Sequence, residues 1–347
     1  MKTDLLRLLN RLLVTHAPTG LEREVDEIVT QELGAMGLTA QRDEHGNVFA
    51  RIQGRNRGRP ALLTAHKDEV STIVRKIDSD GRIWVERLGG CYPAKYGEGP
   101  FDIVTRDGIV EGVLCVGSTH CSDLSARIHR TKTAALTWDM VYVDCRMTGD
   151  QLREQGVRVG DRGVIGRRRK APMLLGGDTI CGYGLDDKGA VAVLLLLARE
   201  LCGTQPCRDV YVGFTAAEEG GCSGGAYLSR TLEASDVIAV EVAPIADEYP
   251  VRLCGDPVVL YKDALYHYSL DLSRELVEAA SGLGIECQRQ VVRAFGSEAS
   301  ASLKAGLIGR GACIGFPTQN THGYEMAPLS AMAACVKVLH SYLTTSE

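Results

Sequence analysis

No run of apolar residues in this sequence is long enough to cross a membrane. The longest, Ala190–Ala198, is far shorter than the roughly 20 residues that a membrane-spanning helix needs. The first residues, MKTDLLRLLNRLLV, interleave charges with leucines at helical spacing, whereas a signal peptide has an uninterrupted apolar core. These absences predict a soluble, cytoplasmic protein that has no targeting segment and no membrane partner.

A strong excess of one charge is also absent. The formal net charge is −5, which gives no electrostatic reason to expect nucleic acid or an anionic membrane as a partner. The one basic run, Arg167–Lys170, is expected to decorate a loop rather than to bind phosphate. The charge balance therefore predicts no nucleic-acid partner.

Paired cysteines are missing as well. The 12 cysteines are spread singly, without a Cys-x-x-Cys pair, which argues against a zinc ribbon or a thioredoxin-type site. We interpret most of them as small buried hydrophobes of a reduced cytosolic protein. Cys222, close after the acidic pair Glu218-Glu219, is a possible reactive neighbour of a site, but packing is the favoured interpretation.

The composition is that of an ordinary soluble globular protein, with 45% hydrophobic and 24% charged residues. A chain of 347 residues allows one large α/β domain with an insert, or two domains. The apolar pattern predicts helices at 4–14, 21–36, 148–155, 186–203, 224–233, 270–283, 298–305 and 327–344. It predicts strands at 38–42, 47–53, 59–66, 209–216 and 236–242.

The stretch from about 71 to 170 has a different texture, with short alternating strands and the tight-turn signals Asp78–Gly81 and Asp107-Gly108. We predict an α/β fold in which residues 1–70 and 171–347 form one discontinuous domain, a mixed sheet sandwiched by helices. Residues 71–170 form a small inserted β-rich domain. In open sheets of this kind, ligands bind beyond the carboxyl ends of the strands.

Five potential metal ligands lie at or just after the ends of apolar runs: His66, Asp186, Glu219, Glu241 and His322. Two imidazoles and three carboxylates suit a pair of borderline divalent ions, with one carboxylate bridging them. Beside one ligand, Glu218 adds the base that metal-assisted hydrolysis requires. The set predicts a two-metal hydrolase.

His66 and Asp68 are two residues apart on an extended segment, so their side chains share one face. This spacing suits a metal-bound imidazole whose other nitrogen is held by a carboxylate, and it places Asp68 with Glu218 in the catalytic set. Each candidate also has a plainer interpretation, and these stay open on the residues alone. Asp186 can cap a helix, and Glu241, inside an apolar strand, can belong to a structural ion pair.

Nine strings resemble, in the same order, a known family, the tetrahedral or deblocking aminopeptidases among the dinuclear-zinc exopeptidases. They are THAPTGLEREVDEI, HGNVFARI, TAHKDEV, VRVGD, LDDKGA, AAEEGG, AVEV, GSEAS and FPTQNTH, and they cover nearly the whole chain. The resemblance implies a metal-dependent aminopeptidase that uses two zinc, cobalt or manganese ions per subunit. It also implies peptide substrates and a tetrahedral homododecamer.

The resemblance further implies a role for each residue at the site. Asp186 bridges the two ions, with Asp187 as its structural neighbour, and Glu218 is the general base and acid. Glu219, Glu241 and His322 are further ligands. The insert holds none of the matched ligands, so it is expected to serve assembly. His120, within the insert, is a candidate for reaching the site of a neighbouring subunit, and the histidines at 16, 45, 129, 267 and 340 are interpreted as structural.

Two residues depart from the family pattern. Glu241 stands where the family normally has aspartate, and Lys67 replaces an apolar residue between His66 and Asp68. Related exopeptidases with carboxyl-end or acyl specificity often carry glutamate at the position of Glu241. An N-acyl amino acid deacylase or carboxypeptidase-like hydrolase therefore remains an alternative. A non-catalytic metal-binding assembly protein is a second alternative, against which the presence of Glu218 argues.

Overall fold

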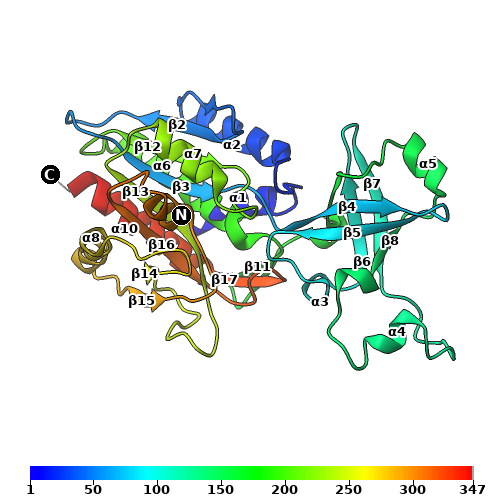
Figure 1. The fold of residues 1–347 in the computed structure, drawn as a ribbon. Coiled ribbons are helices and arrows are strands. Elements are labelled where there is room, and N and C mark those ends of the chain that lie inside the picture. The colour runs from blue at the N-terminus through cyan, green and yellow to red at the C-terminus, as the bar shows by residue number, and fades with distance from the viewer. Residues whose placement is uncertain (346–347) are drawn as a thin grey trace.

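The four middle strands of the main sheet run parallel and place their carboxyl ends at one edge. In this computed structural model, which describes residues 1–345, the sheet has the order β1-β2-β12-β3-β13-β16-β14-β15 (Figure 1). The parallel strands are β12, β3, β13 and β16, whereas β2 and β14 pair with them antiparallel. The bounds are β1 Gln41–Arg42, β2 Val48–Ile52, β3 Ala61–His66, β12 Val210–Thr215, β13 Asp236–Pro244, β14 Val258–Lys262, β15 Gln288–Val291 and β16 Gly311–Thr318.

Helices cover both faces of this sheet, as predicted. One face packs against α1 (Lys2–Leu12), α2 (Arg23–Ala35), α6 (Leu185–Gly203), α8 (Leu270–Gly282) and α10 (Leu329–Thr345). The other face carries α7 (Ser223–Thr231) and α9 (Glu298–Lys304). Every residue of α6 from Leu185 to Ala198 is buried, because this helix lies between the sheet and the helices α1, α2 and α10. After Lys188 this segment is apolar on all sides.

The β-rich insert is a closed barrel that stands to one side of the sandwich (Figure 1). Its strands follow the order β4-β5-β8-β7-β6-β9. The predicted turns at Asp78–Gly81 and Asp107-Gly108 close two of its hairpins. The elements of this region are β4 Ser71–Ile77, β5 Arg82–Leu88, α3 Pro93–Tyr96, β6 Gly99–Val104, β7 Ile109–Cys115, α4 Arg127–Arg130, η1 Trp138–Met140, β8 Tyr142–Asp144, α5 Gly149–Glu154, β9 Arg162–Ile165 and η2 Arg167–Arg169.

The helix predictions agree with the structure to within two residues at most ends, and the strand predictions are less complete. A small sheet of β10 (Met173–Leu175), β11 (Thr179–Gly182) and β17 (Glu325–Pro328) was not predicted. β17 includes residues 327–328, which the apolar pattern assigned to the last helix. β14, β15 and β16 were not predicted either. Except for β16, these strands have three to five residues, too few for alternation to stand out. β16 has eight residues that are all buried, and a continuous apolar run carries no alternation by which to recognise a strand.

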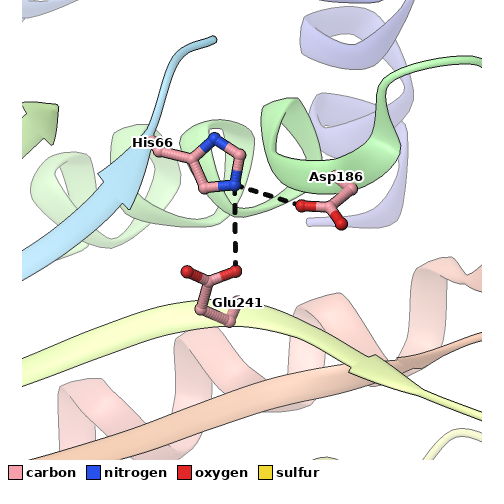
Figure 2. Close-up of side chains that lie close together, drawn as sticks. All are labelled: His66, Asp186 and Glu241. Carbon is pink, nitrogen blue, oxygen red and sulfur yellow. Dashed lines mark hydrogen bonds and ion pairs between the residues drawn. The ribbon is translucent and has the colours of Figure 1, made fainter. Parts of the chain in front are cut away.

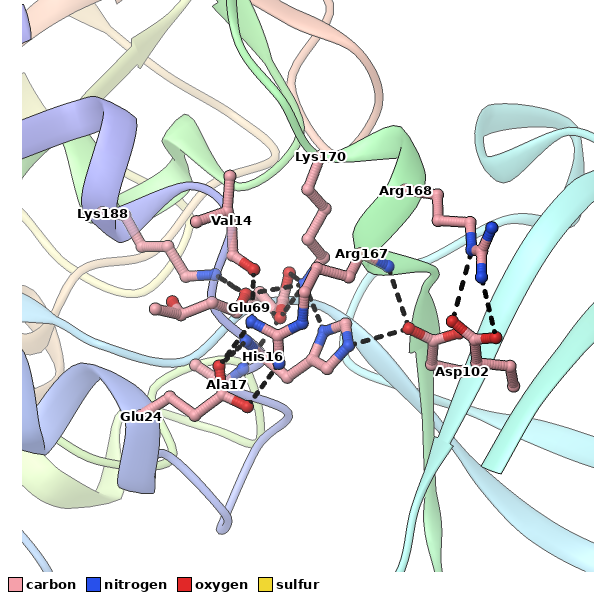
Figure 3. Close-up of polar contacts among 12 residues, drawn as sticks. Val14, His16, Ala17, Glu24, Glu69, Asp102, Arg167, Arg168, Lys170 and Lys188 are labelled. Carbon is pink, nitrogen blue, oxygen red and sulfur yellow. Dashed lines mark hydrogen bonds and ion pairs between the residues drawn. The ribbon is translucent and has the colours of Figure 1, made fainter. Parts of the chain in front are cut away.

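A buried ionic network joins the barrel to the sandwich (Figure 3). The Lys170 ammonium donates to both carboxylate oxygens of Glu69, at 2.6 and 2.9 Å. It also lies 3.0 Å from Nδ1 of His16, whose Nε2 is 2.9 Å from Oδ2 of Asp102 on the barrel strand β6. Lys188 of α6 approaches Glu69 at 3.4 Å. The network therefore links the barrel to helix α6 through a chain of buried contacts.

This arrangement corrects the interpretation of the basic run Arg167–Lys170 as loop decoration. Arg167 pairs with Glu24 at 2.6 Å, and Lys170 is fully buried. Arg168, paired with Glu111 on the barrel, has the exposed setting that was expected, and Arg167 is exposed but bound to the sandwich through Glu24. The run therefore connects the two parts of the chain.

Among residues 1–345, no helix is both long and apolar enough to span a membrane.

Replacing Lys170 by methionine should lower the free energy of unfolding by about 3 kcal/mol, because it leaves the buried Glu69 carboxylate without its nearest cation. Arg168→Met is the matched control, since its ion pair with Glu111 is exposed and screened by solvent and should contribute little to stability. Guanidinium titrations of both variants give the comparison. Equal stabilities would show that the network does not hold the barrel in place.

Candidate metal centre

All the predicted ligands lie at the carboxyl edge of the main sheet or beside it. His66 is the last residue of β3, and Glu241 lies in the second half of β13. Glu219 follows β12, and His322 follows β16. Asp186 enters from the start of α6, where its backbone is not helical (φ −81°, ψ 99°). Four parallel strands thus bring together residues that are far apart in the sequence.

The Asp186 carboxylate lies between the two imidazoles. Its Oδ1 is 3.1 Å from Nε2 of His66, and its Oδ2 is 3.3 Å from Nε2 of His322. Glu241 approaches the same Nε2 of His66 from another direction, with Oε2 at 4.0 Å (Figure 2). Oε1 of Glu219 is 3.6 Å from Nε2 of His322. Each imidazole therefore faces one oxygen of Asp186 and at least one further carboxylate, and His66 also has Glu218 at 3.8 Å from its Nε2.

These contacts define two groups that share Asp186. His66, Asp186 and Glu241 form the first group, and Asp186, Glu219 and His322 form the second. In each group the possible ligand atoms lie within 4.8 Å of one another. A third combination, His66 with Glu218 and Glu219, meets the same limit. The first two groups are the sets expected for two ions bridged by one carboxylate.

The charge of the cluster calls for cations. Burial, reinforced by neighbouring carboxylates, raises the pKa of Glu219 and of Glu241 well above the usual value. Burial alone would lower the pKa of His66, but Glu218 and Asp186 outweigh it and raise that pKa well above its usual value. Burial is likewise outweighed at His322, where Asp186 and Glu219 raise the pKa to about 11. These pKa shifts indicate an excess of buried negative charge at the cluster, which divalent ions would neutralise.

Buried oxygens without a hydrogen-bond partner point the same way. Within residues 1–345, Oε1 of Glu219 and Oδ1 of Asp187 are buried and accept no hydrogen bond. Leaving such an atom unpaired is costly, so it calls for a ligand. The donor set of nitrogen and carboxylate oxygen suits zinc and related ions. The residues therefore fit the metal that their chemistry implies.

Asp68 organises the centre without facing the cavity. Its Oδ1 accepts the backbone N–H of Glu218 at 2.9 Å and lies 3.4 Å from Nδ1 of His66. Its Oδ2 accepts from the Thr19 hydroxyl at 2.9 Å and from the Glu219 N–H at 3.1 Å. The backbone oxygen of Asp68 lies 3.0 Å from the same Nδ1 of His66. Asp68 thus positions the imidazole through its backbone oxygen and carboxylate, and its carboxylate also positions the turn that carries the acidic pair.

Lys67 points away from the centre, as a residue between His66 and Asp68 on an extended segment should. Its ammonium pairs with Asp26 of α2 and donates to the backbone oxygen of Gly46 at 2.8 Å. This departure from the family pattern therefore affects packing behind the sheet.

Glu325 was missed in the sequence. Its Oε2 accepts the N–H of Asp186 at 3.0 Å, and its Oε1 accepts the N–H of His322 at 2.9 Å. Burial and the adjacent Asp186 raise the pKa of Glu325 to about 8. It holds together, through their backbones, the two segments that carry Asp186 and His322. The only sign of this role in the sequence is that Glu325 lies three residues after His322. Such spacing does not distinguish a buried carboxylate from a solvated one.

The inserted barrel also reaches the centre. The backbone oxygen of Gly90 lies 3.1 Å from Nδ1 of His322, and the Lys95 ammonium donates to Oδ1 of Asn320 at 2.6 Å. His322 itself has a left-handed backbone, with φ +57°, which is uncommon outside glycine. The barrel thus supplies the hydrogen bond that orients this imidazole, although none of the predicted ligands lies in it.

The centre lines a cavity of about 510 Å³. One wall consists of the acidic and imidazole side chains. Another wall is apolar and consists of Val242, Pro244, Ala264, Leu265, Ala294 and Phe295. Tyr92 and Lys95 border the cavity from the barrel side. His120 is exposed and does not line it.

Gly90→Ala should weaken metal binding about 10–100-fold, the range for disturbing a residue that orients a ligand. A Cβ at Gly90 would lie 2.6 Å from Nδ1 of His322, so the imidazole must move. Gly58→Ala is the control, because its Cβ would meet nothing within 4 Å. Metal affinity is measured by competition with a chromogenic chelator. Identical affinities for both variants would mean that the barrel does not orient His322.

Comparison with known proteins identifies the family of this chain. Residues 46–338 match the family described as M42 glutamyl aminopeptidase. The protein YhfE of Bacillus subtilis is 27% identical over 351 aligned positions, which cover 97% of this chain and 96% of YhfE. Among solved structures, the TET1 peptidase of Pyrococcus horikoshii superposes with a TM-score of 0.88 at 22% identity, covering 99% of this chain and 100% of its own.

An aminopeptidase from the archaeon Desulfurococcus kamchatkensis superposes with a TM-score of 0.89 at 22% identity, covering 99% of this chain and 96% of its own. These superpositions establish the common fold, and the sequence match over most of the chain establishes the family. The chain belongs to the M42 glutamyl aminopeptidase family.

Proposed function

We propose that this protein removes amino-terminal residues from peptides, using two divalent metal ions and Glu218 as general base. The observation that carries the proposal is the position of Asp186, whose two oxygens each face a different imidazole at 3.1 and 3.3 Å. A carboxylate in this position is suited to bridge two ions. Membership of the M42 family supports the peptidase assignment.

The ligands divide into two sets. His66 and Glu241 would complete one site, Glu219 and His322 the other, and Asp186 would belong to both. When bound, ions such as zinc, cobalt or manganese acidify a water molecule and polarise the peptide carbonyl. Asp68 and Glu325 hold the ligand-bearing segments, so the geometry does not depend on flexible loops alone.

In the proposed reaction, Glu218 takes and returns a proton. Its side chain lines the cavity, with Oε2 at 3.8 Å from Nε2 of His66. Burial raises the pKa of Glu218, and the negative charge of Asp68 adds to this effect. A carboxylate with a raised pKa accepts a proton more readily and can donate it to a leaving amine. In this role Glu218 moves protons and binds no ion.

The apolar wall of the cavity favours apolar amino-terminal residues. The six residues of this wall, from Val242 to Phe295, are uncharged, and Lys95, the one lysine or arginine of residues 1–345 that lines the cavity, lies on the barrel side. An acidic side chain against the apolar wall would lose its hydration without gaining a partner on that wall. We therefore propose specificity for apolar first residues, in contrast to the glutamyl specificity in the family's name.

Homo-oligomerisation is part of the proposal. The TET1 peptidase of Pyrococcus horikoshii can assemble into a tetrahedron or a large octahedral shell, and we propose a dodecamer for this chain. The role of the barrel in assembly remains a prediction. We propose a second role for the barrel, the orientation of His322 through the contact with Gly90.

Glu218→Gln should lower turnover by about 10²–10⁴-fold while both ions stay bound, because the substitution removes proton transfer and keeps the shape of the side chain. Glu219→Ala is the comparison, since it should lose metal. Peptide hydrolysis and metal content by mass spectrometry give the result. Near-normal turnover, or metal loss as complete as in Glu219→Ala, would contradict the role of Glu218.

Glu241 keeps a second function open, that of an N-acyl amino acid deacylase or carboxypeptidase-like enzyme. Its side chain is buried, with Oε2 at 4.0 Å from Nε2 of His66. Glutamate is one methylene longer than the aspartate that is usual at this position in the family. The third possibility, a non-catalytic metal-binding assembly protein, has no use for a carboxylate placed as Glu218 is. Substrate specificity separates these functions.

The metal-loaded protein should cleave peptides with a free amino terminus and prefer leucine to glutamate as first residue by about tenfold or more in kcat/KM. Glu241→Asp should retain or raise this activity. A panel of aminoacyl, acyl-amino-acid and carboxyl-end substrates provides the measurement. Cleavage of acylated or carboxyl-end substrates only, with every free-amino-terminal peptide ignored, would assign the alternative function.

A further inference from the structure

A cysteine hydrogen bonds to the carboxylate that the proposed reaction needs. The thiol of Cys222 donates to Oε1 of Glu218, with 2.9 Å between sulfur and oxygen. Among residues 1–345, this is the only hydrogen bond recorded for the Glu218 side chain. Cys222 is buried and lines the same cavity as the presumptive ligands. Its interpretation as a packing residue therefore leaves this contact unexplained.

The two oxygens of Glu218 face different partners. Oε1 meets the thiol, and Oε2 lies toward the cluster at 3.8 Å from Nε2 of His66. Holding one oxygen limits rotation of the carboxyl group and keeps the other directed at the centre. A thiol is a weak hydrogen-bond donor, so it orients the carboxylate and competes little with a proton for its lone pairs.

The backbone brings the thiol to this position. The N–H groups of Gly221 and Cys222 both donate to the backbone oxygen of Glu218 at 2.7 Å, which closes a tight turn. Cys222 has φ +57°, a left-handed conformation in which glycine is the ordinary residue. Glycine would relieve the backbone but would carry no donor for Glu218.

We propose that Cys222 is a positioning residue, which holds Glu218 in the orientation required for proton transfer. This inference rests on the proposed function of Glu218. Cys222 touches neither the presumptive ions nor the substrate in this role, and it acts through the carboxylate alone. Two consequences follow, one for turnover and one for the position of the Glu218 side chain.

Cys222→Ala and Cys222→Ser form a matched pair, because both keep a Cβ on the same left-handed backbone and differ by one hydroxyl. The alanine variant should lose about 10–100-fold in kcat with KM unchanged, as for a small misplacement of a reacting group. The serine variant should keep kcat within about threefold of the wild type, since its hydroxyl can donate to Oε1. Metal content should be the same in all three proteins.

Crystal structures supply a readout that does not depend on activity. The Glu218 carboxylate should leave its position in Cys222→Ala and keep it in Cys222→Ser. If the alanine variant folds poorly, Cys222→Gly takes its place, because it also removes the thiol and is unstrained at this φ. Loss of kcat and movement of Glu218 are expected for the glycine variant too.

A double-mutant cycle separates positioning from a general structural effect. In a Glu218→Gln background, Cys222→Ala should cause no further loss of residual activity. An equal loss in both backgrounds would overturn the proposal, as would an alanine variant with wild-type kcat and an unmoved Glu218. Should the wild type cleave no free-amino-terminal peptide, the proposed function fails, and the crystallographic comparison alone then decides whether Cys222 positions Glu218.

Discussion

The concentration of negative charge around Asp186 is the constraint on which the rest of the structure depends. Four buried or largely buried carboxylates and two imidazoles meet at one edge of the sheet. Such a group is stable only with compensating positive charge and rigid supports. Divalent ions would supply the charge. The supports are the hydrogen bonds that the carboxylates of Asp68 and Glu325 accept from backbone N–H groups of the segments that carry the ligands.

The barrel is coupled to this centre at two places. Gly90 contacts His322 directly, and the buried network around Glu69 and Lys170 connects the barrel to the sandwich. Glu69 follows Asp68 in the chain, and Lys188 follows the Asp186-Asp187 pair, so the network holds the segments that carry the centre. The insert can thereby affect metal binding, because any tilt of the barrel moves the Gly90 carbonyl relative to His322.

Much of the fold could be predicted because its elements carry strong local patterns. Helix α6 is a long apolar segment, and β3 and β13 are almost continuously buried. The short strands β10, β11 and β17 could not be predicted, since three or four residues carry too little pattern. The basic run was misjudged for a related reason. A lysine in a charged stretch looks solvated, and only the buried carboxylate of Glu69 makes Lys170 an interior residue.

The sequence by itself determined which residues of the candidate centre come together, because His66, Glu219, Glu241 and His322 lie in or follow strands whose carboxyl ends meet. It also marked Glu218 and Asp68 by their spacing from the ligands. Only the tertiary structure decided what holds these residues in place. The contacts of Gly90, Glu325 and Cys222 join segments that are distant in sequence or turn back through a left-handed residue. Local pattern cannot encode such contacts, because each depends on the packing of the whole chain.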